Sequence, residues 1–345
     1  MASLLGGAGH LTAVVAVAQA CRRLGHDTLL LVPPSLAAEA VRTGLAYRVG
    51  HQPSKAVVDK VWAQLRAGGP ESDRGLIDRE LFAERATQAM LGVARAACSE
   101  WRPDLVVREP CEYASAVAAH EARITQAEVG ISVSSIERGV LDMVTPIIER
   151  HGPGVAKAIG AAPYLTSFPA SLDASPWPIT LRFHTPVPAV KDLPGWWPGD
   201  ERPLVYVTFG SVIGYLREAA GVYRSALDAV SVLSARVLPT VGRAVDTDHL
   251  GPIPANTHVE KWVSQADVFG HAAAVVCHGG SGTTFGALAA GVPLAICPLF
   301  ADQPCNAQLV RAAGAGLVAA DQADQPSGLR SLGPAEVIAK HLSRP

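Results

Sequence analysis

A glycine-rich turn in the last third of the chain combines residue types that suit an anion. The stretch "VVCHGGSGTTFGALAAGVPLAICP", Val275 to Pro298, has the pattern of a strand, a turn, a helix and a second strand. Gly279, Gly280 and Gly282 let the backbone turn tightly and approach a ligand closely. The helix that follows begins with unpaired N–H groups and the positive end of its dipole. We therefore predict a phosphate-binding turn.

The side chains of this turn indicate which kind of phosphate-containing ligand it could bind. Hydroxyls of Ser281, Thr283 and Thr284 add donors, and His278 stands at the end of the strand. No Gly-Lys-Ser/Thr follows, so this is not a Walker A loop, and the glycine spacing is not the dinucleotide fingerprint. A diphosphate that is held but not transferred needs no lysine clamp, so a nucleoside diphosphate leaving group fits. The alternative, a tight turn without a ligand, leaves His278 unexplained.

Two further stretches place polar or aromatic groups near this turn. "DQPC" begins with Asp302 and Gln303, a carboxylate and a carboxamide suited to vicinal hydroxyls, at the expected ligand-binding edge of the sheet. Asp302 could instead be only a helix N-cap. "EKWVSQAD" contains Trp262, whose ring could stack on a nucleobase, although a core tryptophan is the commoner case.

The N-terminal "GGAGH" ends in His10, a candidate general base. As a dinucleotide fingerprint it fails, because Thr12 stands at the third glycine's place and the next strand ends in "LVPPS" without an acid for a ribose, so no nicotinamide cofactor is expected. The positive end of the first helix favours a neutral imidazole, as a general base requires. The alternative is a histidine that only caps the helix.

These residues need α/β scaffolds to position them, and strands alternate with helices in two parts of the chain. The expected helices are Leu11–Leu24, Leu76–Glu100, Cys111–Ala122, Arg217–Ala235, Thr283–Ala290 and Pro304–Ala313, with a helical turn at Asp267–His271. The expected strands lie at Ser3–Leu5 and within 27–35, 102–107, 203–211, 235–242, 256–263, 273–280 and 292–298. A proline-dense stretch separates the two parts. We predict an N-terminal domain at 1–165, a linker at 166–203 and a C-terminal domain at 204–345, both doubly wound, facing each other across a cleft.

Composition sets limits on the class of protein. The chain has 345 residues, of which 49% are hydrophobic and 17% charged, a composition typical of globular proteins. Its formal net charge is −2, which gives no reason to expect nucleic acid or an anionic membrane as a partner. Its six cysteines form no CxxC pair, so buried free thiols are expected, with no structural zinc. The start lacks a basic n-region, and no apolar run is long enough to span a membrane, so we expect a cytoplasmic protein.

Taken together, the motifs resemble a known family. The order GxGH, PDLVVRE, a proline-rich linker, TFGS, KWVSQAD, HGGSGTT, GVPLAICP and FADQP is similar to the UGT-like (family 1) glycosyltransferases of the GT-B fold, and most similar to the bacterial branch that glycosylates antibiotics and other secondary metabolites. The similarity is strong from about residue 204 to 317 and weaker before it. It implies two Rossmann-like domains, donor binding by the second, and no required metal or cofactor.

The resemblance also implies roles for individual residues. His10 is expected to deprotonate the acceptor hydroxyl, and Glu109 in "VVREP" to orient it, with Glu112 as the second choice. The implied donor contacts are Ser211, His278, Gly280, Ser281, Gly282 and Thr283 at the diphosphate, Trp262 and Val263 at the base, and Asp302 and Gln303 at the sugar. The expected reaction is a single inverting displacement in which the helix end stabilises the leaving diphosphate.

One departure from the family bears on the donor. Relatives that use UDP-glucose have a glutamate eight residues after the motif histidine, where it holds the ribose hydroxyls, and this chain has Gly286 there. A nucleotide without the 2′-hydroxyl loses less at such a site, so a TDP-deoxysugar is expected over a UDP-sugar. The acceptor, expected to be a polyketide-type natural product, would meet the region from Gln52 to Ile148, where Trp62, Phe82 and Met143 are candidates.

Two other functions fit the same fold. A sugar-nucleotide 2-epimerase would need further acidic residues at the donor and no acceptor base. A non-catalytic helper protein would bind nucleotide or a partner transferase without needing His10. The sequence does not decide between O-, C- and N-glycosylation, and a homodimer is compatible with it.

Overall fold

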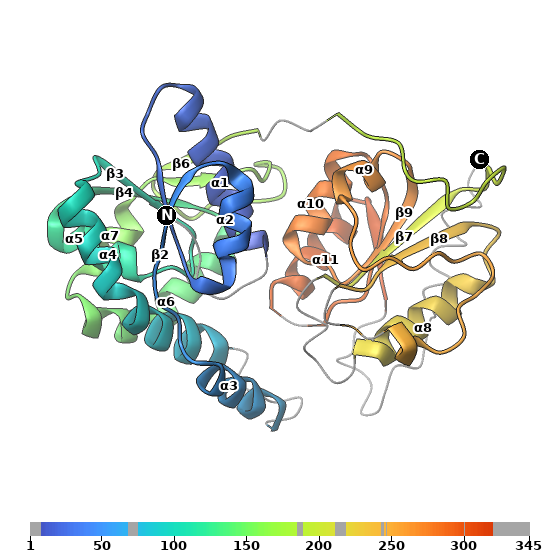
Figure 1. The fold of residues 1–345 in the computed structure, drawn as a ribbon, viewed down its shortest axis with the longest axis horizontal. Helices are drawn as coiled ribbons and strands as arrows, with labels where there is room; N and C mark the ends of the chain where they lie inside the picture. Colours follow the sequence, from blue (N-terminus) through green and yellow to red (C-terminus); the bar gives the residue numbers. More distant parts are fainter. Residues whose placement is uncertain are drawn as a thin grey trace. The chain divides into compact units, whose positions relative to one another are not determined.

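The computed structural model describes residues 8–67, 75–184, 189–210, 219–242, 245, 247–299 and 301–319. The chain forms two compact units, Met1–Thr185 and Pro186–Pro345 (Figure 1). The strand expected at Ser3–Leu5 lies outside the described residues.

The first unit is an α/β domain in which every strand pairing is parallel. Its elements are α1 Ala8–Arg23, β1 Leu29–Val32, η1 Pro34–Leu36, α2 Ala37–Thr43, β2 Ala46–Val49, α3 Lys55–Ala67, η3 Ile77–Ala86, α4 Thr87–Trp101, β3 Leu105–Arg108, α5 Ala114–Ala122, β4 Thr125–Val129, α6 Ser134–His151, α7 Val155–Ala161, β5 Tyr164–Thr166 and β6 Thr180–Arg182. Strands β1 and β2 pair, and a second sheet has the order β3-β4-β5-β6.

Successive residues of β1 point into different cores, as the twofold repeat of a strand requires. Leu30 and Val32 pack with Leu11 and Val14 of α1, whereas Leu31 joins the larger core formed with α4 to α7. A strand buried on both faces reads as a continuous apolar run, and "LLLV" does. The first helix, which carries His10, is thereby fixed against the sheet.

The helix expected at Leu76–Glu100 is present but consists of a π-helical part followed by an α-helical part. Residues Ile77–Ala86 form a π-helix, η3, and Thr87–Trp101 continue as the α-helix α4. The backbone does not break at the junction, because Thr87 still donates its N–H to Glu84 and Phe82. A π-helix is rare and is frequently found at functional sites. Because its hydrogen bonds span five residues instead of four, its side chains point in directions that the α-helical period does not predict.

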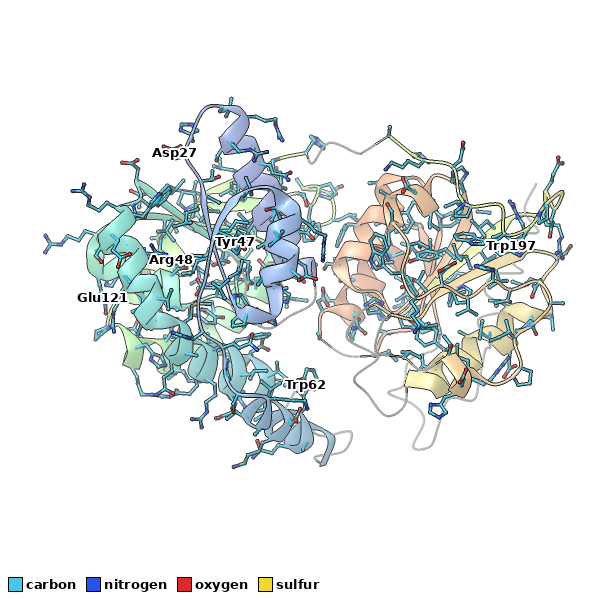
Figure 2. All side chains as sticks on the ribbon, in the orientation of Figure 1. Asp27, Tyr47, Arg48, Trp62, Glu121 and Trp197 are labelled. Atoms are coloured by element: carbon cyan, nitrogen blue, oxygen red, sulfur yellow. The ribbon has the colours of Figure 1, made fainter. Side chains whose placement is uncertain are left out.

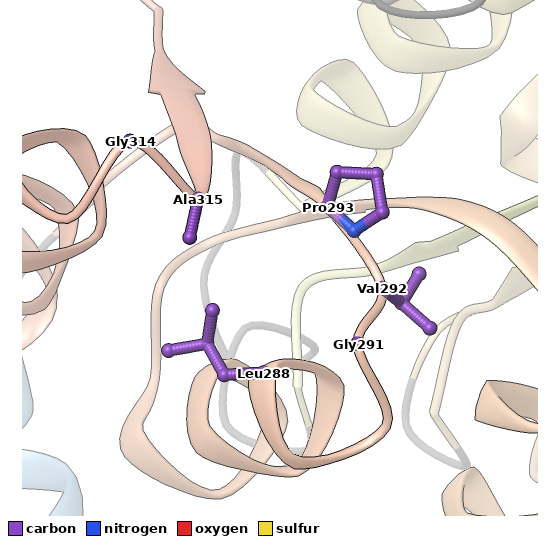
Figure 3. Close-up of a pocket in the computed structure, with 6 residues that line it drawn as sticks. All are labelled: Leu288, Gly291, Val292, Pro293, Gly314 and Ala315. Carbon is purple, nitrogen blue, oxygen red and sulfur yellow. The ribbon is translucent and has the colours of Figure 1, made fainter.

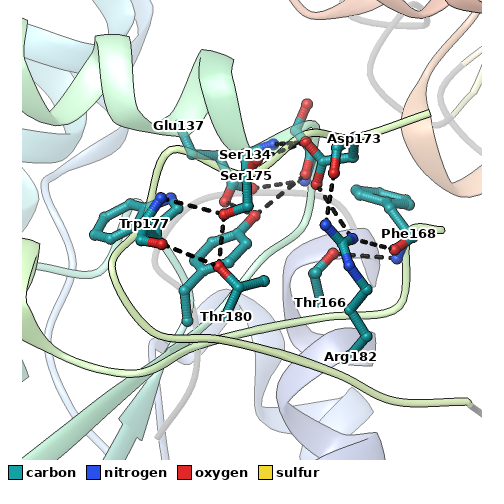
Figure 4. Close-up of polar contacts among 11 residues, drawn as sticks. Ser134, Glu137, Thr166, Phe168, Asp173, Ser175, Trp177, Thr180 and Arg182 are labelled. Atoms are coloured by element: carbon teal, nitrogen blue, oxygen red, sulfur yellow. Dashed lines mark hydrogen bonds and ion pairs between the residues drawn. The ribbon is translucent and has the colours of Figure 1, made fainter. Parts of the chain in front are cut away.

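The stretch 166–203, expected as a linker, contains the division between the units at Thr185 and Pro186. Its first part belongs to the first unit, where β6 adds an edge strand beside β5. A polar network fixes this part (Figure 4): the carboxylate of Asp173 accepts the backbone N–H (3.1 Å) and the hydroxyl of Ser134 at the start of α6, and Arg182 donates to the carbonyls of Phe168 and Asp173, each at 2.6 Å.

The second part of the stretch packs on the second unit. The backbone N–H of Lys191 donates to Asp267 (3.1 Å), and its carbonyl lies 3.1 Å from the imidazole Nε2 of His271. The ring of Trp196 stacks on His258 with 4.8 Å between ring centroids, and Trp197, labelled in Figure 2, meets the same imidazole edge-on. The two halves of this proline-rich stretch are therefore held by different units.

The second unit is a doubly wound parallel sheet. Its elements are β7 Leu204–Thr208, α8 Ala219–Ser231, β8 Arg236–Thr240, η5 Thr247–Leu250, α9 Gln265–Phe269, β9 Ala272–Cys277, α10 Ser281–Ala289, β10 Leu294–Ile296, α11 Gln303–Ala312 and β11 Gly316–Val318. The strand order is β11-β10-β9-β7-β8. The chain reverses direction across the sheet between β7 and β9, and ligands of such sheets bind beyond the carboxyl ends of the strands at that point.

Both faces of this sheet are covered. Val205 and Val207 of β7 pack with α8, whereas Leu204 and Tyr206 pack with the helices α9, α10 and α11. The prediction of a strand within 256–263 is wrong, because Thr257 and Glu260 make only isolated parallel bridges to β8. Among the described residues, no helix is both long and apolar enough to cross a membrane.

Candidate functional site

In the first unit, the structure brings His10 and Glu109 together. Nδ1 of His10, near the start of α1, lies 3.2 Å from Oε2 of Glu109, which directly follows β3. The imidazole is 23% exposed and the carboxylate 0%. A buried carboxylate on Nδ1 fixes the ring orientation and favours the tautomer in which Nε2 has the free electron pair. The structure thus brings the imidazole and the buried carboxylate within ion-pair distance.

The same carboxylate is held by its own turn. Oε2 of Glu109 also accepts the backbone N–H of Cys111 at 2.7 Å. Beneath it, Arg108 and Glu128 form a buried ion pair between facing positions of β3 and β4. Glu112, the second choice for orienting the histidine, instead accepts hydrogen bonds from the backbone N–H and hydroxyl of Ser115, so it holds the first turn of α5.

Two residues of η3 lie near His10 and carry no recognisable motif. The ring of Phe82 is 6.0 Å from the imidazole, centroid to centroid. Asp78 interacts electrostatically with His10, but burial dominates and raises the pKa of its carboxyl to about 6. The sequence offers Phe82 only as one apolar candidate in a helix, and gives no signal for Asp78, because the π-helical winding decides where both point.

In the second unit, His278 follows β9 and is enclosed by glycines. A Cβ atom at Gly210 or Gly280 would lie 2.8 or 2.5 Å from Nε2 of the imidazole, so a side chain at either position would force the ring to move. Burial lowers the pKa of His278 to about 4, although Asp302 and the backbone of Thr208 favour the protonated ring. Nδ1 is buried and has no hydrogen-bond partner among the described residues.

The helix α10 begins after a glycine N-cap and has an exposed glycine in its first turn. Its N-cap is Gly280, in extended conformation, and no side chain caps the helix. Gly282 is exposed and has open space around its Cα. The N–H groups of the first turn have no partner within the helix, and the helix dipole adds partial positive charge. The start of α10 thus offers backbone N–H donors, and phosphate binding at this turn stays a prediction.

The hydroxyls of Ser281 and Thr283 have partners inside the protein. Ser281 donates to Oδ2 of Asp302 at 2.6 Å, and the amide of Asn306 donates to the Gly279 carbonyl at 2.8 Å and to Oδ2 of Asp302 at 3.0 Å. Thr283 lies 3.1 Å from Nε2 of Gln265. These two hydroxyls thus bond within the protein, whereas the N–H groups of the first turn of α10 have no partner within the helix. Asn306 had no sequence signal beyond its place one helical turn after Asp302.

The "DQ" pair lies as expected at the carboxyl edge, but the two side chains differ. Asp302 is at the N-cap of α11, yet its carboxylate makes no capping hydrogen bond and contacts Ser281 instead. Gln303 is buried, with Oε1 accepting the Leu299 N–H at 2.8 Å. Ala301, which precedes them, has φ of 56°, in the left-handed region that residues with a Cβ atom rarely adopt. The loop is thus held in a strained shape, a common property of functional sites.

Trp262 is 67% exposed, so it is not a core tryptophan. The side chain of Val263 packs against the core, which leaves its backbone as the accessible part. Gly286 has a packing reason of its own, since a Cβ there would lie 2.8 Å from the ring of Phe269. Ser211 lies outside the described residues.

A small apolar hollow of about 190 Å³ also occurs in this unit (Figure 3). It lies between the C-terminal end of α10 and the start of β11, and is lined by Leu288, Gly291, Val292, Pro293, Gly314 and Ala315. No polar side chain lines it, and the N-terminal end of α10 is at the opposite edge of the sheet. It cannot therefore be the diphosphate site.

The two α/β units have the fold of the GT-B glycosyltransferases, as comparison with known proteins shows. Residues 195–330 match the family model described as "UDP-glucoronosyl and UDP-glucosyl transferase". The chain is 30% identical over 333 residues to the TDP-daunosamine transferase DnrS of Streptomyces peucetius, which covers 82% of this chain and 76% of that protein. The crystal structure of the glycosyltransferase SnogD from Streptomyces nogalater superposes with a TM-score of 0.70 and 26% identity, covering 91% of this chain and 84% of SnogD.

The chain belongs to this family of UGT-like glycosyltransferases, in the branch that contains antibiotic-biosynthesis enzymes. Another relative, the elloramycin glycosyltransferase ElmGT of Streptomyces olivaceus, is 34% identical over 235 residues. That match spans 66% of this chain and 60% of the relative's length.

Proposed function

We propose that this protein is an inverting glycosyltransferase that moves a deoxysugar from TDP to a hydroxyl of a polyketide-type natural product. The observation that carries the proposal is the contact between Nδ1 of His10 and the buried carboxylate of Glu109. A nucleotide-binding helper needs no such pair, and a 2-epimerase needs no base for an acceptor. The first unit thus supplies the base for the acceptor, and the second binds the donor.

In the proposed reaction, the acceptor oxygen forms a bond to the anomeric carbon while the bond from that carbon to the diphosphate oxygen breaks on the opposite side. Nε2 of His10 takes the hydroxyl proton, and Glu109 stabilises the imidazolium that forms. The leaving diphosphate gains charge, which the N–H groups and dipole at the start of α10 stabilise. The neutral His278 can donate one hydrogen bond to the same group.

The nucleotide part of the proposal is supported by Trp262 and Gly286. The exposed indole of Trp262 is available to stack on a base. Gly286 offers no acceptor for a ribose 2′-hydroxyl, and Phe269 occupies the space that a side chain there would need. The relative DnrS, named a TDP-daunosamine transferase, supports TDP as the donor nucleotide. Tighter binding of UDP than of TDP in side-by-side calorimetry would contradict this part.

The transfer itself is tested with His10→Ala and with His26→Ala, an exposed histidine of the same unit, as control. Loss of a general base typically reduces the rate by about 10²- to 10⁴-fold. We expect that loss in His10→Ala with TDP affinity unchanged, and wild-type transfer in the control. Undiminished transfer by His10→Ala would refute the assignment. A new sugar nucleotide formed without any acceptor would favour the epimerase.

A further inference from the structure

A mixed set of ligand atoms gathers where β3 ends. One atom each from His10, Glu109 and Cys111 lies within 4.8 Å of the other two. The cysteine and histidine spacing along the chain gives no hint of this, because α1 and the β3–α5 turn supply the residues from distant parts of the sequence. Cys111 has no part in the proposed sugar transfer, so its thiol in this position needs another explanation.

The three ligand types suit a thiophilic divalent cation. Imidazole, carboxylate and thiolate together are ligands of zinc, which binds four ligands at about 2.0–2.3 Å. Ligand atoms of such a tetrahedron lie about 3.4–3.7 Å apart, so the set must close by roughly 1 Å at its widest. The half-buried side chains of His10 and Cys111 allow rotamer changes of that size, whereas Glu109 is fully buried and fixed by the Cys111 N–H.

The electrostatics of the turn favour a cation. Cys111 lies close enough to Glu109 and Asp78 for their negative charges to act on its thiol. The same charges attract a dication, and a bound metal ion stabilises the thiolate directly. On binding, the thiol proton passes to water and the sulfur forms its bond to the metal, so the net reaction releases one proton.

We propose that His10, Glu109 and Cys111 form a binding site for a thiophilic divalent cation, with Zn²⁺ as the probe, and that its occupancy switches off the base. Nδ1 of His10 is the nitrogen that faces Glu109. A metal on Nδ1 leaves the ring proton on Nε2, which is then a donor and can no longer accept the acceptor's proton. This inhibitory consequence rests on the proposed function, whereas the binding site does not.

Binding is tested with Co²⁺, whose complex with a thiolate gives a charge-transfer absorption band. The full chain, freed of metal and of thiol reductants, is titrated as wild type, Cys111→Ser and Cys21→Ser, the last removing another half-buried thiol of the same unit. We expect the band in wild type and Cys21→Ser, and its loss in Cys111→Ser. A band that persists in Cys111→Ser, or no band in wild type, overturns the site.

A second measurement does not depend on the variant folding. In the wild-type protein, Zn²⁺ should protect Cys111 from alkylation at least tenfold more than it protects Cys21, as counted by mass spectrometry of the peptides. Equal labelling of Cys111 with and without Zn²⁺ overturns the site. Neither this measurement nor the Co²⁺ titration needs transferase activity, so failure of the proposed function would not affect them.

The switch is then tested by kinetics. Zn²⁺ should lower kcat of the wild type with little effect on the KM for the acceptor, because the metal lies on the far side of the imidazole. Cys111→Ser should need at least tenfold more Zn²⁺ for half inhibition, and Cys21→Ser should behave as wild type. Equal sensitivity of wild type and Cys111→Ser overturns the switch.

Discussion

The half-buried imidazole of His278 predicts how the stability of the second unit depends on pH. Its pKa is about 4 in the folded protein against 6.5 in an exposed histidine. Between these pH values the unfolded chain binds the proton and the folded chain does not, so the free energy of unfolding falls as pH falls. The contribution is complete above pH 6.5 and is lost on the way to pH 4.

The two pKa values fix the magnitude. The loss of stability should be about 2 kcal/mol at pH 5 and about 3 kcal/mol at pH 4, relative to pH 7. In His278→Gln the side chain cannot titrate, so this component disappears. The substitution also disturbs packing against Gly210 and Gly280, but that loss does not vary with pH.

The assay is urea unfolding of wild type and His278→Gln at half-unit steps from pH 7.5 to 4.5. The quantity of interest is the difference in unfolding free energy between the two proteins, because titrating groups that do not interact with His278 cancel in it. We expect the variant to recover about 2 kcal/mol relative to wild type between pH 7 and pH 5. A difference that stays constant over this range would show that the imidazole is solvated in the folded protein and would refute the reasoning.

Three other predictions follow from the packing and exposure of single residues. Gly286→Glu should destabilise the protein by about 1–3 kcal/mol in thermal or urea unfolding, because the new side chain meets the ring of Phe269. Adding Phe269→Ala should not restore the stability, because the loss of this ring opens a cavity in the core. Asn306→Leu should lower stability by about 1–3 kcal/mol, since the buried Gly279 carbonyl loses its donor; an unchanged melting curve would contradict this. Trp262→Ala should weaken TDP binding in calorimetry by about 1–3 kcal/mol while leaving the melting temperature unchanged; equal TDP affinity would show that the indole does not stack.

Local pattern predicted the scaffold of the second unit well. A continuous apolar run predicts a strand buried on both faces, and the glycines after it predict a turn. In the structure, β9 and the start of α10 lie at these positions. The segment 256–263 shows the limit of this logic. Its apolar alternation resembles a strand, but two isolated bridges to β8 are all the pairing it makes, because pairing depends on a neighbour that the local pattern does not contain.

Sequence motifs indicated the residue types of the candidate site but not their contacts within the protein. Nothing local connects His10 with Glu109, and their pairing was expected only from the family resemblance. The hydroxyl of Ser281 looked like a ligand donor, but Asp302 takes it, and the outcome depends on where α11 places its first turn. A polar side chain can bond to a ligand or to another group of the protein. The neighbours that compete for it decide which, and residue identity alone does not reveal those neighbours.

The way the proline-rich stretch is divided matters for building hybrid enzymes. Lys191, Trp196 and Trp197 are fastened to the second unit, whereas Arg182 and Asp173 are fastened to the first. A chimera that joins this acceptor unit to another protein's donor unit should therefore be cut near residues 185–186. A cut at residue 203, where the sequence suggests the next domain begins, would separate the tryptophan pair from the histidine on which it stacks and expose both rings to solvent.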